Sequence, residues 1–277
     1  MNLNGKRILL TGAAGGIGHP LALALSKKGA VLALVDRDQT RINVLCEKIN
    51  QLGGIGGTGG KAVPVISDFQ VTLANPNPTQ KVVEIAIGLL GGIDILINGA
   101  GILDFTLLQE QDMARIAQMM YINATVPIQL TRALLPQLLS QNGGQIVNIG
   151  SIFGSIGFPH YATYSASKFA LRGFSQALRR ELVDTDISVT YIAPRAIKTS
   201  MNDPEASKML EATKTAMDEP QVVVTEIIKA IEADKHEHYI GQPESFFAWL
   251  NGVLPKVVSM GIKKTSRIAR KFINGKN

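Results

Sequence analysis

The sequence contains little that is typical of secreted, membrane-spanning or disordered proteins. Cys46 is the one cysteine among 277 residues, which excludes an intrachain disulfide framework and suits a reducing compartment. No run of about eighteen apolar residues occurs, so no membrane-spanning helix is expected. The apolar run at residues 8–10 is too short for a signal peptide, and we therefore expect a cytoplasmic protein. Hydrophobic residues make up 45% and charged residues 18% of the chain, which indicates an ordered globular protein.

Acidic residues are scarce at the C-terminal end of the chain. Residues 244–277 contain seven lysines and arginines and one acid, Glu244, whereas the whole chain has 28 basic and 22 acidic residues. The remainder of the chain therefore carries equal numbers of the two charges, and this end holds the whole net charge of +6. A neutral body argues against nucleic acid as a partner.

Short apolar segments alternate with segments of good helix formers along most of the chain. Strands are predicted at residues 6–11, 30–35, 61–66, 93–97, 146–149 and 187–192. Helices are predicted at residues 21–28, 40–52, 79–90, 107–121, 126–139 and 161–183. This alternation predicts an α/β fold with a doubly wound, Rossmann-type parallel sheet and helices on both faces. We expect one domain at residues 1–243 and a C-terminal amphipathic helical extension at residues 244–277.

Glycines separate the first predicted strand from the first predicted helix, at Gly12, Gly16 and Gly18. Glycines in this position let the backbone approach a pyrophosphate, which then lies against the free amides of the helix N-terminus. The alternative is a glycine-rich turn that binds no ligand. A second glycine-rich run, at residues 53–60, follows a helix instead of a strand, so we predict a flexible connection there.

Asp36 ends the second predicted strand, eighteen residues after Gly18. That spacing is close to the one expected for a carboxylate that binds the ribose hydroxyls of adenosine. A carboxylate there repels a 2′-phosphate, which favours NAD over NADP. Arg37 could receive that phosphate, and a surface acid without a ligand is the alternative for Asp36.

Tyr164 and Lys168 are four residues apart on a predicted helix, so their side chains share one face. An ammonium beside a phenol favours the phenolate, and we expect the pKa of Tyr164 to be lowered from about 10. Such a tyrosine can give a proton to a carbonyl or take one from an alcohol. Ser151 follows the fifth predicted strand and could hydrogen-bond the same oxygen.

Polar and glycine residues follow nearly all of the predicted strands. Ligands bind parallel sheets at the carboxyl ends of the strands, so these residues are expected to line one edge together. They are residues 12–18, Asp36, Asp68, residues 98–101, Ser151 and Pro194. Asn123 lies instead within a predicted helical region, where it is either an exposed surface residue or one placed for a purpose.

Five elements in order resemble the short-chain dehydrogenase/reductase family across residues 5–240. They are Thr-Gly-x-x-x-Gly-Ile-Gly at residues 11–18, Asn-x-Ala-Gly at residues 98–101, Asn123, Ser151, and Tyr-x-x-x-Lys at residues 164–168. The resemblance implies that Tyr164 is the acid/base and that Lys168 holds the nicotinamide ribose and lowers the tyrosine pKa. It implies that Ser151 positions the substrate oxygen and that Asn123 supports a water-linked proton relay.

The same resemblance implies the cofactor site, with Asp68 against the adenine and Thr199 against the nicotinamide amide. Together with the residues above, the expected cofactor contacts are Gly12, Gly16, Ile17, Gly18, Asp36, Asp68, Asn98, Ala100, Gly101, Tyr164, Lys168, Pro194 and Thr199. The family is commonly dimeric or tetrameric, so a homo-oligomer is expected.

Two positions depart from the family pattern. Gly99 stands where the family usually has a second asparagine, and Arg195 stands where it usually has glycine. Arg195 could reshape the substrate mouth or contact an acidic substrate group, or it could point to solvent. His19 and His160 have no cysteine or carboxylate cluster at ligand spacing, so no metal is expected.

These features predict an NAD(H)-dependent oxidoreductase that interconverts a secondary alcohol and a ketone, or a primary alcohol and an aldehyde. Residues 196–218, which the family uses as a mobile lid, contain Met201, Met209 and Met217. Methionines there suit an adaptable apolar pocket, and hence a lipophilic small-molecule substrate. A dinucleotide-binding sensor without turnover and a membrane-peripheral scaffold of the same fold are the alternatives.

Two amphipathic stretches form the C-terminal extension. Phe246, Trp249, Leu250, Val253 and Leu254 follow a helical apolar stripe, which we expect to pack on the body or on another subunit. Six basic residues within residues 256–271 share an arc of about 120°. We expect residues 256–272 to contact a membrane surface through this arc, with packing and solvated charges as the alternative.

Overall fold

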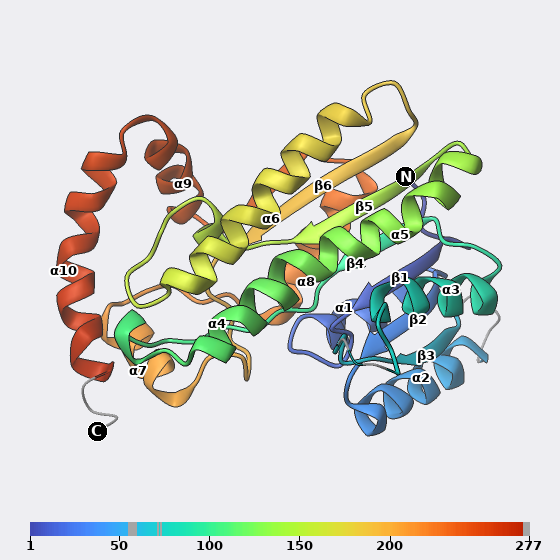
Figure 1. Cartoon of the computed structure of the whole chain (residues 1–277), viewed down its shortest axis with the longest axis horizontal. Helices are drawn as coiled ribbons and strands as arrows, with labels where there is room; N and C mark the ends of the chain where they lie inside the picture. The colour runs from blue at the N-terminus through green and yellow to red at the C-terminus, as the bar shows by residue number, and fades with distance from the viewer. Residues whose placement is uncertain (55–59, 71, 73, 274–277) are drawn as a thin grey trace.

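A computed structural model describes residues 1–54, 60–70, 72 and 74–273 (Figure 1). Its seven strands form one sheet in the order β3-β2-β1-β4-β5-β6-β7, with every neighbouring pair parallel. The strands are β1 (Arg7–Thr11), β2 (Val31–Asp36), β3 (Ala62–Ile66), β4 (Ile95–Asn98), β5 (Gly144–Ile149), β6 (Ile187–Pro194) and β7 (Glu237–Ile240).

The helices of the described chain connect these strands and extend beyond them. They are α1 (Gly18–Lys27), α2 (Gln39–Gly54), α3 (Pro78–Leu90), α4 (Met113–Met120), α5 (Val126–Ser140), α6 (Ala162–Glu181), α7 (Pro204–Ala212), α8 (Pro220–Glu232), α9 (Glu244–Val253) and α10 (Pro255–Ile273).

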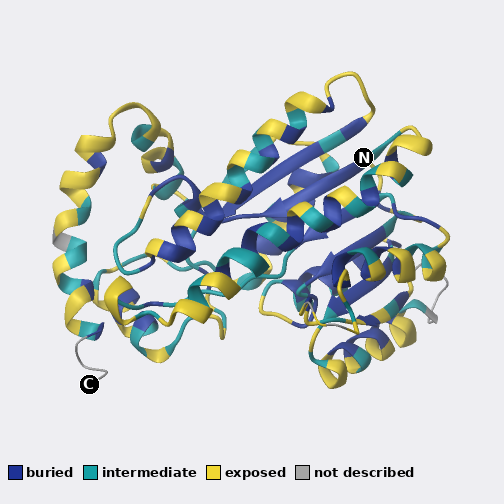
Figure 2. Cartoon of the chain, in the orientation of Figure 1, coloured by how far each residue is buried: buried dark blue, intermediate teal, exposed yellow. Residues whose placement is uncertain are grey.

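Helices cover both faces of the sheet because successive strand side chains point to opposite sides. On β1, Ile8 and Leu10 join the core under α1, α2 and α8, whereas Leu9 joins the core under α3, α5 and α6. All three of these side chains are fully buried, and Figure 2 shows the central strands as buried over most of their length. The predicted doubly wound parallel sheet is confirmed.

The predicted helical region at residues 107–139 differs from the structure at both its start and its middle. Asp112 caps α4 by accepting hydrogen bonds from Ala114 N and Arg115 N, so the helix begins six residues later than expected. A π-helical turn at Tyr121–Thr125 separates α4 from α5. Pro127 has no N–H to donate to the Asn123 carbonyl four residues earlier, which favours this wider turn.

No element was predicted for residues 219–243, where the structure has α8 and β7. β7 is a four-residue edge strand whose burial does not alternate, so it leaves no period-two pattern in the sequence. In the glycine-rich run at residues 53–60, residues 55–59 lie outside the described chain, so the predicted connection there stays a prediction.

The extension folds back along one end of the molecule, where α9 and α10 lie beyond α7 (Figure 1). Ala248 and Val258 pack with Ile152 and Ile156 of the body. Near the other end of α10, Ala269 and Ile273 join a cluster that includes Met209 of α7. Within the described residues, no helix is both long and apolar enough to cross a membrane. The boundary between residues 243 and 244 stays a prediction.

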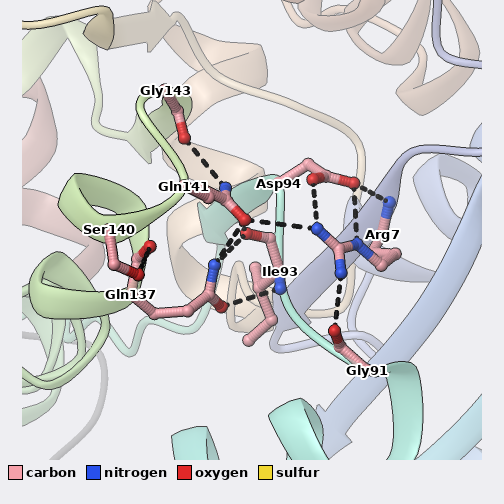
Figure 3. Close-up of polar contacts among 8 residues, drawn as sticks. All are labelled: Arg7, Gly91, Ile93, Asp94, Gln137, Ser140, Gln141 and Gly143. Atoms are coloured by element: carbon pink, nitrogen blue, oxygen red, sulfur yellow. Dashed lines mark hydrogen bonds and ion pairs between the residues drawn. The ribbon is translucent and has the colours of Figure 1, made fainter.

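At the amino ends of the strands, the side chain of Arg7 links the start of β1 to the residues just before β4 (Figure 3). Its guanidinium donates to both carboxylate oxygens of Asp94, at 2.6 and 3.1 Å, and to Gly91 O at 2.7 Å. Gln137 continues the network by pairing with the backbone of Ile93. Burial alone would raise the pKa of Asp94, but the hydrogen bonds and charge of Arg7 outweigh it and lower that pKa.

We expect Asp94→Asn to lower the free energy of unfolding by about 1–3 kcal/mol at pH 7, because it removes the charge that pairs Arg7. Since the folded pKa of Asp94 is lowered, the stabilisation is complete above its ordinary pKa of about 4 and is lost as pH falls through the folded value. Urea unfolding measures the difference. Lys208→Ala, which breaks a pair in which the lysine is 62% exposed, should cost less than about 0.5 kcal/mol. Equal losses in the two variants would contradict this assignment.

Candidate functional site

The glycine-rich loop between β1 and α1 packs closely against two other segments at the carboxyl edge of the sheet. A Cβ on Gly12, whose φ is +69°, would lie 2.8 Å from Ala100 N, and one on Gly16 would lie 2.6 Å from Thr199 Cβ. Thr11 Oγ1 accepts hydrogen bonds from Gly99 N and Ala100 N, both at 3.1 Å. The structure therefore brings the loop, residues 98–101 and Thr199 together as predicted.

The start of α1 is suited to an anion. Ile17 precedes the helix and cannot cap it with its side chain, and the first turn contains no acidic residue. Gly15 and Gly16 are exposed, so their backbone is accessible. A helix N-terminus of this kind, reached over glycines, fits the pyrophosphate of a dinucleotide.

Asp36 lies beside this loop. Its carboxylate accepts from Ala14 N at 2.9 Å and from Asp38 N at 3.2 Å, and the residue is half-buried. Arg37 and Asp68 are exposed, the latter just beyond β3, with its carboxylate accepting from Gln70 N. The structure thus places Asp36 within the site and Asp68 at its outer margin.

Tyr164 and Lys168 lie on the buried side of α6, where Tyr164 is 9% and Lys168 5% exposed. Lys168 Nζ donates to Ile149 O at the end of β5, at 3.1 Å, and lies 5.7 Å from the centre of the Tyr164 ring. Ser151, two residues after β5, lies close enough to the Tyr164 hydroxyl to lower the pKa of that phenol. The three predicted side chains therefore meet at one place.

The expected direction of the Tyr164 pKa is wrong for this structure. Burial raises the pKa of Tyr164 to about 12, and the interaction with Ser151 only partly offsets it. Burial also lowers the pKa of Lys168 to about 8. Removal from water disfavours the charged form of each group, which is the phenolate of Tyr164 and the ammonium of Lys168. Tyr164 is therefore a neutral phenol at neutral pH, ready to donate a proton.

Asn123 is fully buried, so of the two alternatives it is the placed residue. Its amide pairs with both backbone groups of Ile102, at 2.8 Å each, and donates to Ser167 Oγ at 3.0 Å. Ser167 in turn donates to Tyr164 O at 2.7 Å. A Cβ on Gly101 would lie 3.4 Å from Asn123 Oδ1 and 3.6 Å from Lys168 Nζ, so this glycine runs between them.

Several residues that support the site were not predicted from the sequence. Ser167 is one, and Tyr191 of β6 is another, since its hydroxyl donates to Ser151 O at 3.1 Å. Asn148 of β5 is a third, since its Oδ1 accepts a hydrogen bond at 2.8 Å from the predicted residue Asn98, which anchors β4 to β5. A polar residue within an otherwise apolar strand, as at Asn148, was the one signal available.

An apolar wall adjoins Tyr164. It consists of aromatic residues on the loop before α6, methionine and leucine of α7, and the inner face of α10. Met209 is buried in this wall and Met217 packs against it, whereas Met201 is 44% exposed. A hollow of about 340 Å³ lies beside the wall, between residues 103–115 and the lid residues Met201 and Asp203.

Arg195 neither points to solvent nor remains free for a substrate. Its guanidinium donates to Asp218 at 2.8 and 3.0 Å, to Glu244 at 3.0 Å and to Gln242 O at 2.8 Å. These contacts raise the Arg195 pKa, chiefly through Asp218. A Cβ on Gly241, whose φ is +96°, would lie 2.5 Å from Arg195 Cδ. Arg195 therefore fixes the end of the lid segment and the start of α9 to the end of β6.

The described residues include no group of three or more His, Cys, Asp and Glu side chains that could hold a metal ion. His160 contacts Phe105 edge to face and Ser266 O of α10 at 3.4 Å, which gives it a packing role.

A family model described as short chain dehydrogenase matches residues 6–210. The chain belongs to this family. The family consists of oxidoreductases that use nicotinamide cofactors.

Relatives and solved structures agree with this assignment. Ketoacyl reductase HetN of Nostoc sp. is 32% identical over 241 residues, covering 87% of this chain and 80% of its own length. The 3-oxoacyl-acyl-carrier-protein reductase FabG of Vibrio cholerae is 30% identical over 201 residues, covering 73% and 77%. A short chain dehydrogenase/reductase from Burkholderia phymatum, solved in complex with NAD, has a TM-score of 0.81 at 20% identity and covers 93% and 96%, which shows the shared fold.

Arg195→Gly should loosen the lid and the extension together, because it removes the contacts to both Asp218 and Glu244. We expect amide hydrogen exchange at residues 196–218 and 244–273 to rise by roughly 5–100-fold, with residues 7–36 unchanged. Glu244→Gln should affect residues 244–273 alone. Exchange that stays unchanged in both segments of the glycine variant would contradict the role of Arg195.

Proposed function

We propose that the protein is an NAD(H)-dependent oxidoreductase that interconverts a secondary alcohol and a ketone, or a primary alcohol and an aldehyde. The observation that carries the proposal is the meeting of Tyr164, Ser151 and Lys168 in one buried place. It lies between a glycine-rich, anion-accepting loop and an apolar wall. When bound, the nicotinamide supplies or accepts the hydride. The residues of the chain have to transfer the proton and position the substrate oxygen.

The residues of the chain divide this work. Tyr164, a neutral phenol, donates its proton to the carbonyl oxygen in reduction and accepts one from the alcohol in oxidation. Ser151 holds the substrate oxygen, and the ammonium of Lys168 stabilises the phenolate that forms. Asn123, fixed through Ile102 and Ser167, supports the path by which Tyr164 regains its proton.

The cofactor would be held by the glycine loop, by Asp36 and by the segment at residues 98–101, with Pro194 and Thr199 at the nicotinamide end. The carboxylate of Asp36 supports NAD over NADP, because it lies half-buried at the loop and repels a 2′-phosphate. Asp68 would contact the adenine from the outer margin.

The substrate is proposed to be a lipophilic small molecule. Its support is the apolar wall of Tyr161, Phe105, Met209 and the inner residues of α10 next to Tyr164. Two relatives carry names that describe reduction of ketoacyl groups, which agrees with a carbonyl substrate. We further propose a cytoplasmic homo-oligomer in which residues 256–272 lie at a membrane surface.

Tyr164→Phe should lower turnover by about 10³-fold or more, since no other group is placed to exchange the proton. The dissociation constant of NADH should stay within about twofold of the wild-type value, because the Tyr164 hydroxyl is not part of the glycine-rich loop that would bind the pyrophosphate. A panel of ketones and alcohols of graded chain length, followed by NADH absorbance, measures the first quantity, and calorimetry measures the second.

The matched control is Tyr161→Phe, which removes a second buried hydroxyl in the same wall and should keep kcat within about tenfold. Near-normal turnover in Tyr164→Phe would defeat the mechanism. Activity confined to small polar substrates would leave the mechanism intact and defeat the lipophilic assignment.

Asp36→Ala should shift cofactor preference toward NADP by about tenfold or more, because the repulsion of a 2′-phosphate disappears. The substitution should also weaken the binding of NAD, since the hydrogen bond between the Asp36 carboxylate and Ala14 N, which supports the loop, is lost. The ratio of kcat/KM for the two cofactors measures the shift. Asp38→Ala, a neighbouring control, should leave the ratio unchanged, and a wild-type enzyme that prefers NADP would refute the assignment.

A further inference from the structure

Seven large apolar side chains are exposed where α9 turns into α10. We name this group the apolar corner; its residues, 43–70% exposed, are Phe246, Phe247, Trp249, Val253, Leu254, Val257 and Met260. Figure 1 places the corner at the end of the molecule farthest from β1–β3, and Figure 2 shows it as a largely exposed stretch. A contiguous exposed apolar patch of this kind marks an interaction site.

The corner is held in shape by the residues behind it. Ala248 and Val258 are buried against Ile152 and Ile156, with Leu250 and Ile262 packed around them. A single residue, Leu254, separates α9 from α10, so the chain turns sharply there. On the outer side, the Phe246 ring lies 5.8 Å from those of both Phe247 and Trp249. The exposed residues therefore form a fixed aromatic and aliphatic edge.

The segment that bears the corner carries charge of one sign. Residues 245–273 contain six basic residues and no acid, and Lys256 and Lys263 are exposed on the same helix as Val257 and Met260. Glu244, directly before this segment, is paired with Arg195. In a two-fold contact between copies, the same patch meets itself and would set like charges against each other. An anionic surface complements the corner instead.

We infer that the apolar corner inserts into the surface of an anionic lipid bilayer, with the lysines around it at the headgroups. An amphipathic helix of this composition places its apolar side at the boundary of headgroups and acyl chains. The inner residues Ala269 and Ile273 stay packed on α7, so residues 246–260 form the edge that inserts, and the rest of residues 256–272 lies along the headgroups. The inference rests on the proposed membrane-peripheral location and makes it more specific. Its test measures lipid contact, not turnover, so the membrane inference and the proposed enzymatic function can fail independently.

Trp249 makes the inference directly testable, because it is the one tryptophan of the chain and is 63% exposed. Vesicles of phosphatidylcholine with about 30% phosphatidylserine should shift its emission to shorter wavelength, and brominated acyl chains should quench it. Vesicles of phosphatidylcholine alone should bind more weakly, and added salt should weaken binding to the anionic vesicles.

Variants then assign the binding to the corner. Leu254→Ser combined with Met260→Ser should lower partitioning into anionic vesicles by about tenfold or more. Val183→Ser, at a site 74% exposed outside the corner, is the matched control and should leave partitioning unchanged. Lys256→Gln with Lys263→Gln should reduce the preference for anionic vesicles.

Two outcomes would overturn the inference. One is Trp249 emission that neither vesicle shifts and brominated lipid does not quench. The other is emission that shifts with protein concentration alone, accompanied by dimers in sedimentation that the Leu254→Ser, Met260→Ser protein does not form. That result would show that a second copy covers the corner.

Discussion

The buried ammonium of Lys168 is the constraint on which the rest of the site depends. Burial lowers its pKa from 10.5 to about 8, which corresponds to a cost on the order of 3 kcal/mol for keeping it charged at neutral pH. The fold offsets part of this through the Ile149 carbonyl and the ring of Tyr164. Gly154 is needed because a Cβ there would lie 2.8 Å from the carbonyl oxygen of Lys168. Such an arrangement has little value for stability and is typical of a site that moves a proton.

The second constraint is that the lid segment at residues 196–218 and the C-terminal extension, which are far apart in the chain, both pack beside Tyr164. The guanidinium of Arg195 pairs with Asp218 and Glu244, and so fixes the end of the lid segment to the start of the extension. The two segments meet again farther along, where Met209 of α7 packs in the same cluster as Ala269 and Ile273 of α10. The apolar wall beside Tyr164 is therefore built partly by the extension, which the family match at residues 6–210 does not include.

Much of the fold and the meeting of the site residues could be predicted from the sequence, because they follow from local periodicity. The strands β1 to β6 leave short apolar runs in the sequence, and a four-residue spacing sets Tyr164 and Lys168 on one helical face. The start of α4 was misplaced because the cap at Asp112 went unrecognised. The direction of the Tyr164 pKa could not be predicted, since it depends on burial by residues from several elements. The partners of Arg195 are 23 and 49 residues away and share no local pattern with it.

The backbone beside Arg195 has a consequence for how this protein can change over time. Gly241 has a left-handed conformation and passes so close to the aliphatic stem of Arg195 that no side chain fits between them. An alanine at position 241 would displace the side chain of Arg195. If a bulkier residue occupied position 241, an arginine at position 195 could not adopt its present conformation. The two positions are therefore coupled: a side chain at 241 requires either a smaller residue at 195 or a different course for the arginine stem.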